Sequence, residues 1–270
     1  MMLLRSVAKT AVNSPPNFPF NVPAIANLQT VAFSSPVTFL AGENGSGKST
    51  FLEALACAVG SITVGSQSVQ RDPTLTAVRR LTPYLKLTWS KKSRKGFFMR
   101  AEDFFGYARQ LNENRAEMEQ ELAKLDDEYQ GRNFAKELAS LPYRREIGAL
   151  RQSYGDGLDA NSHGEGFLKL FQERFVGEGL YLLDEPEAPL SPMRQLAFLA
   201  MLHQMVQQNA QFIIATHSPI LMAYPNATIL SFDGGTVSEV AYESLEHVQV
   251  TRSFLQNPAV YFRHLFEDVE

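Results

Sequence analysis

Residues 42–49 read Gly-Glu-Asn-Gly-Ser-Gly-Lys-Ser, and this segment constrains the fold more than any other. An apolar run at 37–41 precedes it, and an apolar, helix-forming run follows it at 50–55. A strand, a glycine-rich loop and a helix in this order form a phosphate-binding loop, because glycines let the backbone N–H groups turn inward toward an anion. The helix also aims the positive end of its dipole at the same point. The segment therefore predicts a nucleotide-binding site in an α/β fold.

The residues of this loop have distinct expected contacts with a nucleotide. Lys48 brings a positive charge to the phosphates, and the hydroxyl of Ser49 can ligate Mg²⁺. The alternative, a fortuitous glycine-rich turn, is disfavoured because the pattern arises by chance in roughly one in a hundred chains of this length. The expected nucleotide contacts are Asn44, Gly45, Ser46, Gly47, Lys48, Ser49 and Thr50.

Bulk properties limit the class of protein. The 270 residues fit one large α/β domain or a core with an inserted subdomain. A net charge of −4 gives no broad attraction to nucleic acid or to acidic membranes. The single cysteine, Cys57, excludes an internal disulfide and an all-cysteine metal site, and we expect it to be a small core residue.

The chain also lacks the usual membrane signals. Charges interrupt the apolar start at 1–9, so no signal peptide is recognised. No stretch approaches the roughly 20 apolar residues that span a bilayer. We therefore expect a cytoplasmic protein with no direct membrane insertion.

Strand and helix patterns alternate in the second half of the chain. Strands are predicted at 180–183, 212–215 and 228–232, and a helix at 192–209. This alternation predicts a mainly parallel sheet flanked by helices, with a small antiparallel part. The expected division is a nucleotide-binding lobe at 1–106, a helical insertion at 107–160 and a C-terminal lobe at 161–270.

Residues 107–150 are charged and helix-forming. Leu122, Leu125 and Tyr129 form an apolar stripe of about one heptad, which is too short for an extended coiled coil. The pattern predicts a small helical insertion on the core.

The segment 79–100 contains eight basic residues and no acidic one. Alternation predicts a strand at 84–89, followed by a turn at 91–96 into an apolar stretch at 97–99. With its interleaved aromatic residues, the segment could contact nucleic acid. The alternative is a solvated β-hairpin whose aromatic residues face the core, and we favour it because the rest of the chain is acidic.

Polar residues end two of the predicted strands. Asp184 and Glu185 follow the strand at 180–183, and His217 follows the strand at 212–215. In open α/β sheets, ligands bind at this edge. If the strand stays extended, the two acids face opposite ways, so Asp184 can serve Mg²⁺ while Glu185 orients or deprotonates water. His217 can hydrogen-bond the terminal phosphate. A turn with solvated acids and a structural histidine are the alternatives.

These motifs in this order resemble the ABC-type ATPase superfamily, especially its soluble, SMC-like and RecF-like branch of predicted bacterial ATPases. The resemblance covers the phosphate loop, the strand ending in Asp184-Glu185, the segment 186–192 in the dimer-loop position and His217 as switch histidine. It also includes Asn161-Ser162-His163-Gly164-Glu165-Gly166, which is similar to the family's signature loop, L-S-G-G-Q or L-S-G-G-E.

The resemblance implies a composite site shared between two subunits. In this family the signature loop caps the ATP bound to the opposite subunit, which implies a head-to-tail homodimer with Ser162 and Gly164 in that role. Asn161 and His163 depart from the family pattern, and an ordinary helix N-cap remains the alternative for Ser162. A family lid-loop glutamine is missing, and Glu102 is a candidate substitute. Phe18 and Phe20 are candidates for stacking on adenine.

The resulting hypothesis is a Mg²⁺-dependent ATPase that dimerises around ATP and acts as a switch on an unidentified protein partner. Lys48, Glu185 and His217 would carry catalysis, and Ser49 and Asp184 would hold the metal. Two alternatives remain: the ATP-binding subunit of a membrane transporter, and a P-loop phosphotransferase.

Overall fold

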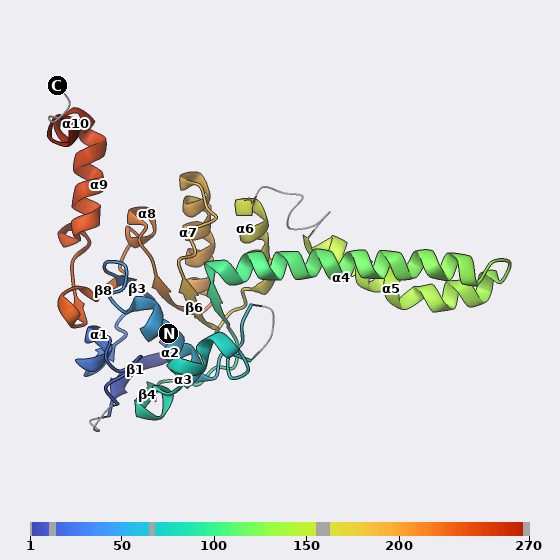
Figure 1. Cartoon of the computed structure of the whole chain (residues 1–270), viewed down its shortest axis with the longest axis horizontal. Coiled ribbons are helices and arrows are strands. Elements are labelled where there is room, and N and C mark those ends of the chain that lie inside the picture. Colours follow the sequence, from blue (N-terminus) through green and yellow to red (C-terminus); the bar gives the residue numbers. More distant parts are fainter. Residues whose placement is uncertain (1, 11–14, 65–67, 155–162, 267–270) are drawn as a thin grey trace.

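Two sheets form the centre of the molecule in a computed structural model that describes residues 2–10, 15–64, 68–154 and 163–266. The larger has six strands in the order β5-β6-β7-β3-β8-β9, and only β9 runs antiparallel to its neighbour. The smaller is antiparallel, in the order β2-β1-β4. Figure 1 shows helices packed around these sheets and two helical projections. The predicted α/β class, with a mainly parallel sheet and a small antiparallel part, is confirmed.

The strands are β1 (Leu4–Lys9), β2 (Thr30–Ala32), β3 (Val37–Ala41), β4 (Leu85–Trp89), β5 (Phe98–Arg100), β6 (Leu180–Asp184), β7 (Gln211–Ala215), β8 (Thr228–Ser231) and β9 (Ser238–Glu239). The helices are α1 (Pro23–Ala26), α2 (Lys48–Val59), α3 (Thr76–Arg79), α4 (Ala101–Glu128), α5 (Asn133–Tyr154), α6 (His163–Arg174), α7 (Pro192–Gln207), α8 (Pro219–Met222), α9 (Glu246–Gln256) and α10 (Pro258–Phe266).

The central strand β3 separates two hydrophobic cores. Side chains alternate across a strand, so Val37 and Phe39 pack on one face of the sheet while Leu40 packs on the other. On the first face, Phe171 of α6 and Phe198 of α7 belong to a cluster of closely packed aromatic rings. On the second face, α2 and the smaller sheet cover the strands. Both faces are buried, which explains why β3 is apolar along its length.

Several predicted elements are confirmed. The strand predicted at 37–41 is β3, and the strands predicted at 180–183, 212–215 and 228–232 are β6, β7 and β8 to within one residue. The helix predicted at 192–209 is α7. Cys57 is buried on α2, as expected for a small core residue.

The prediction of a β-hairpin between 84 and 99 is wrong. The two strands exist, but β4 pairs antiparallel with β1 in the small sheet, and β5 pairs parallel with β6 in the large one. Phe97 and Met99 lie in one core and Phe98 lies in the other. A strand that is apolar on both faces suits a buried parallel sheet, whereas the alternating pattern of β4 suits a half-exposed one.

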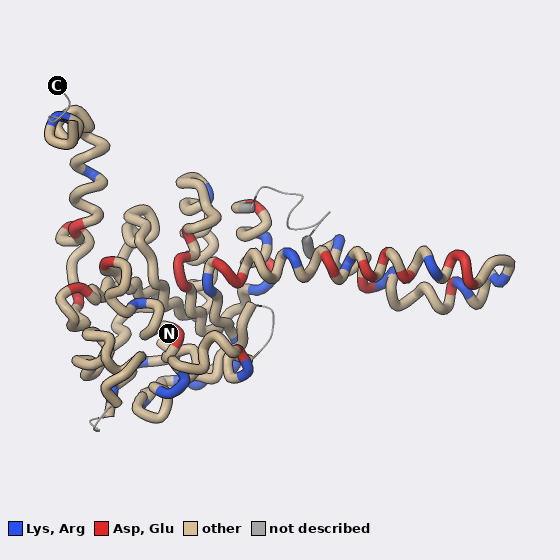
Figure 2. Tube along the Cα trace, in the orientation of Figure 1, with Lys and Arg blue, Asp and Glu red and all other residues tan. Residues whose placement is uncertain are grey.

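The helical insertion predicted at 107–160 is present, but it consists of two long helices and is not a small compact unit. Helices α4 and α5 pack along each other and form an arm that projects from the sheet core (Figure 1). Charged residues of both signs line the arm (Figure 2). Six of the partly buried positions along α4 and its C-cap follow alternating spacings of four and three, which is the heptad pattern of a coiled coil; they are Leu111, Arg115, Met118, Leu122, Leu125 and Tyr129.

Polar residues at these heptad positions, which form the seam between α4 and α5, explain why the sequence indicated only about one heptad. Arg115 is a seam position of α4, and its side chain is only 20% exposed. Lys136 occupies a similar place on α5, with 31% exposure and an ion pair to Asp126 at 3.0 Å. Counting only apolar residues therefore finds about one heptad, although the heptad positions continue along the arm. Long charged side chains can fill such positions because they bury their stems and keep their charges in water.

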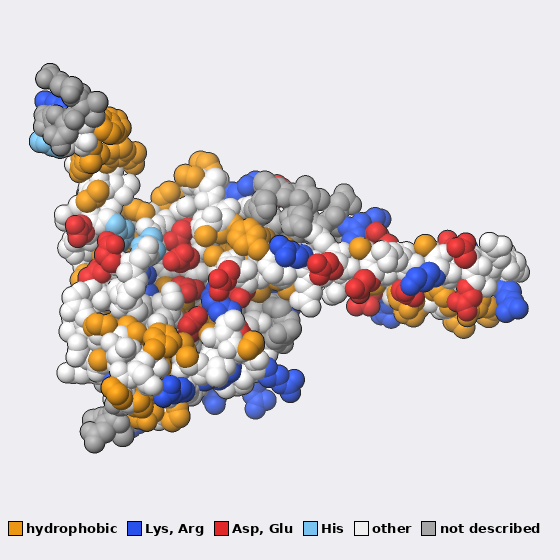
Figure 3. Space-filling model, viewed as in Figure 1, with side chains coloured by type: hydrophobic (Ala, Val, Ile, Leu, Met, Phe, Trp, Pro, Cys, Tyr) orange, Lys and Arg blue, Asp and Glu red, His pale blue; other side chains and the backbone are white. Residues whose placement is uncertain are grey.

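The C-terminal helices α9 and α10 form the second projection. Phe254 of α9 packs against Tyr261 and Phe262 of α10. Apolar side chains remain exposed there, and Figure 3 shows them gathered on this pair of helices. Across the ranges that the structure describes, none of the helices combines the length and the apolar character needed to cross a membrane.

Candidate nucleotide-binding site

The phosphate loop connects β3 directly to α2. Gly42, Gly45 and Gly47 have positive φ angles of 140°, 80° and 105°, which turn the backbone tightly around the loop. Gly47 also has no room for a side chain, because a Cβ there would lie 2.7 Å from Cγ1 of Val22. The outer residues Asn44 and Gly45 are exposed. The sequence thus folds into the open, glycine-lined cradle that binds phosphate.

Lys48 lies inside this loop. Its side chain is buried, and Nζ donates hydrogen bonds to the carbonyl oxygens of Gly42 at 2.6 Å and Glu43 at 3.0 Å. Burial lowers the pKa of Lys48, and the nearby carboxylates of Asp184, Glu185, Asp233 and Glu43 oppose that shift. These carboxylates favour the charged ammonium form of Lys48, which is the form that can bind a phosphate oxygen.

Ser49 and Asp184 bring the loop to the end of β6. The Ser49 hydroxyl donates to Oδ1 of Asp184 at 3.2 Å. Asp184 is only 7% exposed, and burial raises its pKa to about 7. Two oxygen groups at this distance suit Mg²⁺, which prefers hard oxygen ligands and takes the rest from phosphate and water. The pair predicted as metal ligands therefore lies together and fits the ion.

Glu185 follows Asp184 but does not continue the strand. Its φ is 51°, in the left-handed region, and its backbone N–H donates to the carbonyl of Ala215 at 2.9 Å. The extended backbone on which the opposite directions of the two acids were expected therefore ends at Asp184. Left-handed backbone is uncommon outside glycine and concentrates at functional sites. The Glu185 side chain is half-exposed, 48%.

His217 faces Glu185 from the end of β7. Its Nε2 lies 4.0 Å from Oε1 of Glu185. That nitrogen is buried and has no hydrogen-bond partner among the described residues, and the same holds for Oγ of Ser46 in the loop. Two unsatisfied buried polar atoms are costly unless a ligand or water completes them. Both are thus candidates for contact with a bound nucleotide.

Neighbours of His217 hold its backbone in place. Glu187 accepts a hydrogen bond from the His217 N–H at 2.7 Å, which ties the 186–192 segment to the end of β7. Burial raises the pKa of Glu187. Ser218 caps the short helix α8 by accepting from the N–H of Leu221, and Thr216 accepts from the N–H of Ser218. Thr216 and Ser218 therefore stabilise the local turn between β7 and α8.

Two contributors were not predicted. Asp233, just after β8, accepts a hydrogen bond from the N–H of Glu43 at 2.8 Å and so supports the phosphate loop from a distant part of the chain. His247 on α9 has a buried, unpartnered Nε2 among the described residues. Burial lowers its pKa, and His217, Asp233, Glu43 and Lys48 also act on it, so it lies near the site. Neither residue belongs to a recognisable local pattern.

The signature-like loop is only partly described. Ser162 lies outside the described residues. Gly164 is buried in the first turn of α6, where a Cβ would lie 2.7 Å from the carbonyl oxygen of Pro189 and 2.8 Å from Cδ of Arg194. Glycine at this position therefore has a packing reason within the same chain. Its predicted contact with a partner's nucleotide stays a prediction.

The remaining candidates differ in exposure. Phe20 is 3% exposed and packs edge-on against Tyr84, so it belongs to the core and offers no free ring face to adenine. Phe18 is 45% exposed and stays a candidate. Glu102 is in the first turn of α4, with an ion pair to Arg100 at 3.5 Å, and its lid-loop role stays a prediction.

Several basic and aromatic residues between 79 and 100 contact other parts of the chain. Lys91 and Lys95 both pair with Glu178, at 2.6 Å and 3.7 Å. Arg79 donates to the carbonyls of Val69 and Asp72. Phe97 and Phe98 are buried. These contacts favour the structural interpretation of this segment over a nucleic-acid surface.

Comparison with known proteins agrees with the motifs. A family described as AAA domain matches residues 20–147, which include the phosphate loop and most of the arm. No curated protein matches the sequence significantly.

The solved structures that match this chain include SMC heads and ATP-binding cassettes. An Smc head domain with an extended coiled coil, bound to the C-terminal domain of ScpA and derived from Pyrococcus furiosus, has 11% identity and a TM-score of 0.45, covering 94% of this chain and 100% of that one. The cbiO1 protein from Clostridium perfringens, part of the ABC transporter complex cbiONQ, has 16% identity and a TM-score of 0.49, covering 99% and 100%. A dimeric ATP-binding cassette bound to ADP and phosphate has 13% identity and a TM-score of 0.45, covering 90% and 99%.

The phosphate loop, the acid-ended strand beside it and the AAA-domain match all indicate a nucleotide-binding site. Residues 20–147 of this chain are similar to the AAA-domain family, and the phosphate loop within them contacts the acid at the end of β6.

Proposed function

We propose that this protein is a Mg²⁺-dependent ATPase that dimerises around ATP and acts as a switch on a protein partner. The observation that supports hydrolysis best is the meeting of three strand ends at one edge of the sheet. There the Ser49 hydroxyl contacts Asp184 at 3.2 Å, and His217 faces Glu185 at 4.0 Å. Ser49 and Asp184 are suited to holding the metal beside the phosphates. Glu185 and His217 are suited to contacting the attacking water and the terminal phosphate.

Binding uses the loop and Lys48. When the phosphates of ATP enter, the Lys48 ammonium exchanges its bonds to the Gly42 and Glu43 carbonyls for phosphate oxygens. Ser49 and Asp184 would hold Mg²⁺, which supplies positive charge to the phosphates during transfer. Because Asp184 must be ionised to serve as a ligand, metal binding and loss of its proton are linked.

Hydrolysis uses Glu185 and His217. The Glu185 carboxylate is half-exposed, so water can reach it, and it can orient that water or accept its proton. The His217 nitrogen then has the terminal phosphate as its hydrogen-bond partner. Glu187 fixes the His217 backbone, so that loss of the phosphate can be passed to the 186–192 segment. A switch of this kind draws on contacts that exist only before hydrolysis.

Dimerisation rests on the signature-like motif and on the open phosphate loop. Asn44 and Gly45 are exposed at the outer rim of the loop, where a second subunit has access to the nucleotide. In the proposed dimer, Ser162 and Gly164 of the opposite copy complete the site.

The variant Glu185→Gln tests this function. It preserves the shape of the side chain but removes the base, so hydrolysis falls by about 100-fold or more while ATP binding remains. Size-exclusion chromatography with light scattering should then show a dimer with Mg-ATP and a monomer without it. Lys48→Ala is the matched control, and it should neither bind ATP nor dimerise. A Glu185→Gln variant that stays monomeric at saturating Mg-ATP contradicts the proposal.

A further inference from the structure

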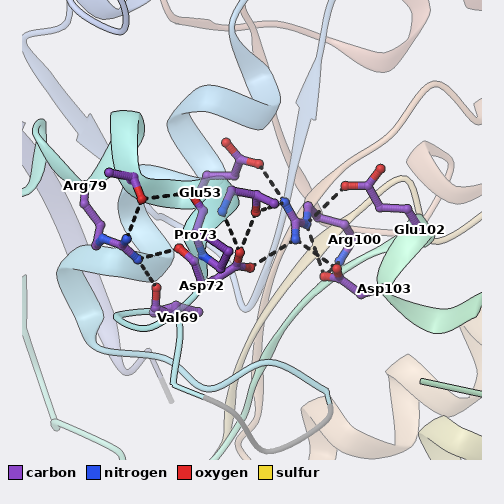
Figure 4. A network of polar contacts seen from close by, with 10 residues as sticks. Glu53, Val69, Asp72, Pro73, Arg79, Arg100, Glu102 and Asp103 are labelled. Carbon is purple, nitrogen blue, oxygen red and sulfur yellow. Dashed lines mark hydrogen bonds and ion pairs between the residues drawn. The ribbon is translucent and has the colours of Figure 1, made fainter. Parts of the chain in front are cut away.

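A largely buried arginine, Arg100, lies where the large sheet meets the arm. Strand β5 ends at Arg100 and helix α4 begins at the next residue, Ala101. The Arg100 side chain is 13% exposed and reaches across the end of the sheet, as Figure 4 shows. Movement of the arm at its base therefore acts directly on the backbone of this residue.

Arg100 binds carboxylates from three separate parts of the chain. It contacts Glu53 of α2 at 3.6 Å, Asp72 before α3 at 3.1 Å, and Glu102 and Asp103 of α4 at 3.5 Å and 2.9 Å. Its backbone N–H also donates to Asp103 at 3.0 Å, which caps the arm's first helix. One guanidinium thus faces four acids, and their shared attraction keeps it in place (Figure 4).

The cluster depends on this cation. Burial raises the pKa of Glu53, and Arg100 opposes that shift. The hydrogen bond and the charge of Asp103 raise the pKa of Arg100, against its burial. Without the guanidinium, Glu53, Asp72 and Asp103 would face one another as partly buried carboxylates, and mutual repulsion would push them apart.

The same helix face connects Arg100 to the nucleotide site. Ser49 and Glu53 are four residues apart on α2, so they share one side of the helix. Ser49 bonds Asp184 at the end of β6, and Glu53 pairs with Arg100 at the end of β5. Arg100 and Asp184 are register partners in these adjacent parallel strands. Two polar contacts, one helical turn apart, therefore hold α2 to neighbouring strand ends.

We propose that Arg100 is a positioning residue that couples the arm to the Mg²⁺ side of the nucleotide site. Any rotation of α4 changes which of its carboxylates Arg100 can hold, and therefore how firmly Arg100 holds Glu53. A shift of Glu53 moves Ser49 relative to Asp184. By reciprocity, nucleotide binding moves the arm, and a partner that moves the arm alters Mg-ATP affinity. This inference rests on the proposed ATP-dependent function.

The variant Arg100→Gln tests the coupling, with Arg79→Gln as its matched control. Arg79 lies in the same neighbourhood and also binds Asp72, through its backbone carbonyl, but its hydrogen bonds run to residues 69, 72 and 76 and not to the arm. Arm position is measured as the distance between spin labels on Gln130→Cys, at the turn between α4 and α5, and Thr88→Cys on β4. Both sites are exposed, and the native Cys57 is buried.

In the unaltered protein, Mg-ATP should shift the distance distribution between the labels. In Arg100→Gln the distribution should be the same with and without Mg-ATP, and the Mg²⁺ concentration that half-saturates binding of a fluorescent ATP should rise at least about fivefold. Arg79→Gln should behave as the unaltered protein does. If Arg100→Gln does not fold, Asp103→Asn replaces it, because it removes the arm's shortest ion pair with Arg100, leaves Glu53 and Asp72 in place, and should weaken the shift.

The outcomes separate the two proposals. An Arg100→Gln protein that keeps both the arm shift and the Mg²⁺ dependence overturns the coupling, as does an Arg79→Gln protein that loses both equally. An unaltered protein that binds Mg-ATP without any movement of the arm overturns the coupling alone. If the unaltered protein binds no nucleotide, the proposed function fails and the coupling fails with it.

Discussion

Replacing Gly164 with alanine separates its role within one chain from its role across a dimer. In the folded monomer, the new Cβ would lie 2.7 Å from the carbonyl oxygen of Pro189 and 2.8 Å from Cδ of Arg194. The arginine side chain can move, but the carbonyl belongs to the backbone and cannot yield without shifting the 186–192 segment. Overpacking of this kind costs about 1–3 kcal/mol. Higher helix propensity of alanine returns about 1 kcal/mol, so we expect a net loss of up to about 2 kcal/mol.

The matched control is Gly106→Ala on α4. That glycine is also helical, and a Cβ there would meet no atom within 4 Å. It should gain up to about 1 kcal/mol from propensity alone. Urea denaturation of both variants without nucleotide, followed by circular dichroism, measures the difference, which we expect to be about 1–3 kcal/mol because the propensity gain is common to both variants and only the overpacking cost remains. If Gly164→Ala is as stable as Gly106→Ala, the packing argument is refuted, and the glycine serves only the contact between subunits.

Three further predictions concern the core and the loop. Phe171→Ala removes a ring that packs against several others, and should cost about 3–5 kcal/mol in urea denaturation, whereas the exposed Phe134→Ala should stay within about 0.5 kcal/mol. Burial raises the pKa of the Cys57 thiol to about 11, so a thiol reagent at pH 8 should label the folded protein far more slowly than the unfolded one. Fast labelling of the folded state would contradict this. Mg-ATP should slow Cys57 labelling further by stabilising α2, and this protection should be lost in Lys48→Ala, as measured by labelling kinetics.

The parts of the site that could be predicted from the sequence are those in which chemistry and spacing are local. The phosphate loop is continuous in the chain, so its glycines, Lys48 and Ser49 can be recognised together as one motif. Asp184 and His217 each end an apolar strand, and parallel strands bring such ends to one edge of the sheet. Knowledge of two local patterns was enough to predict that these side chains meet, and the contact between Ser49 and Asp184 confirms it.

The parts that could not be predicted depend on partners distant in the sequence. Asp233 supports the N–H of Glu43 across 190 residues, and no spacing rule joins the two. The seam of the arm includes Arg115, which a search for apolar heptad positions does not detect. Arg100 looked like one of several exposed basic residues, although three parts of the chain surround it with acids. In each case tertiary packing decides whether a charge is buried or solvated, and local sequence does not record it.

The order of strands in the large sheet has a consequence for how the chain is made. Strand β3 lies between β7 and β8, so both of its neighbours come from residues 211–231, far behind the phosphate loop at 42–49. During synthesis, both edges of β3 therefore stay unpaired until nearly the whole polypeptide has left the ribosome. Such long-range pairing folds slowly and exposes strand edges to other chains. A nascent or truncated chain that stops before residue 211 should therefore neither form the nucleotide site nor stay free of aggregation, and chaperones should hold it until the last strands arrive.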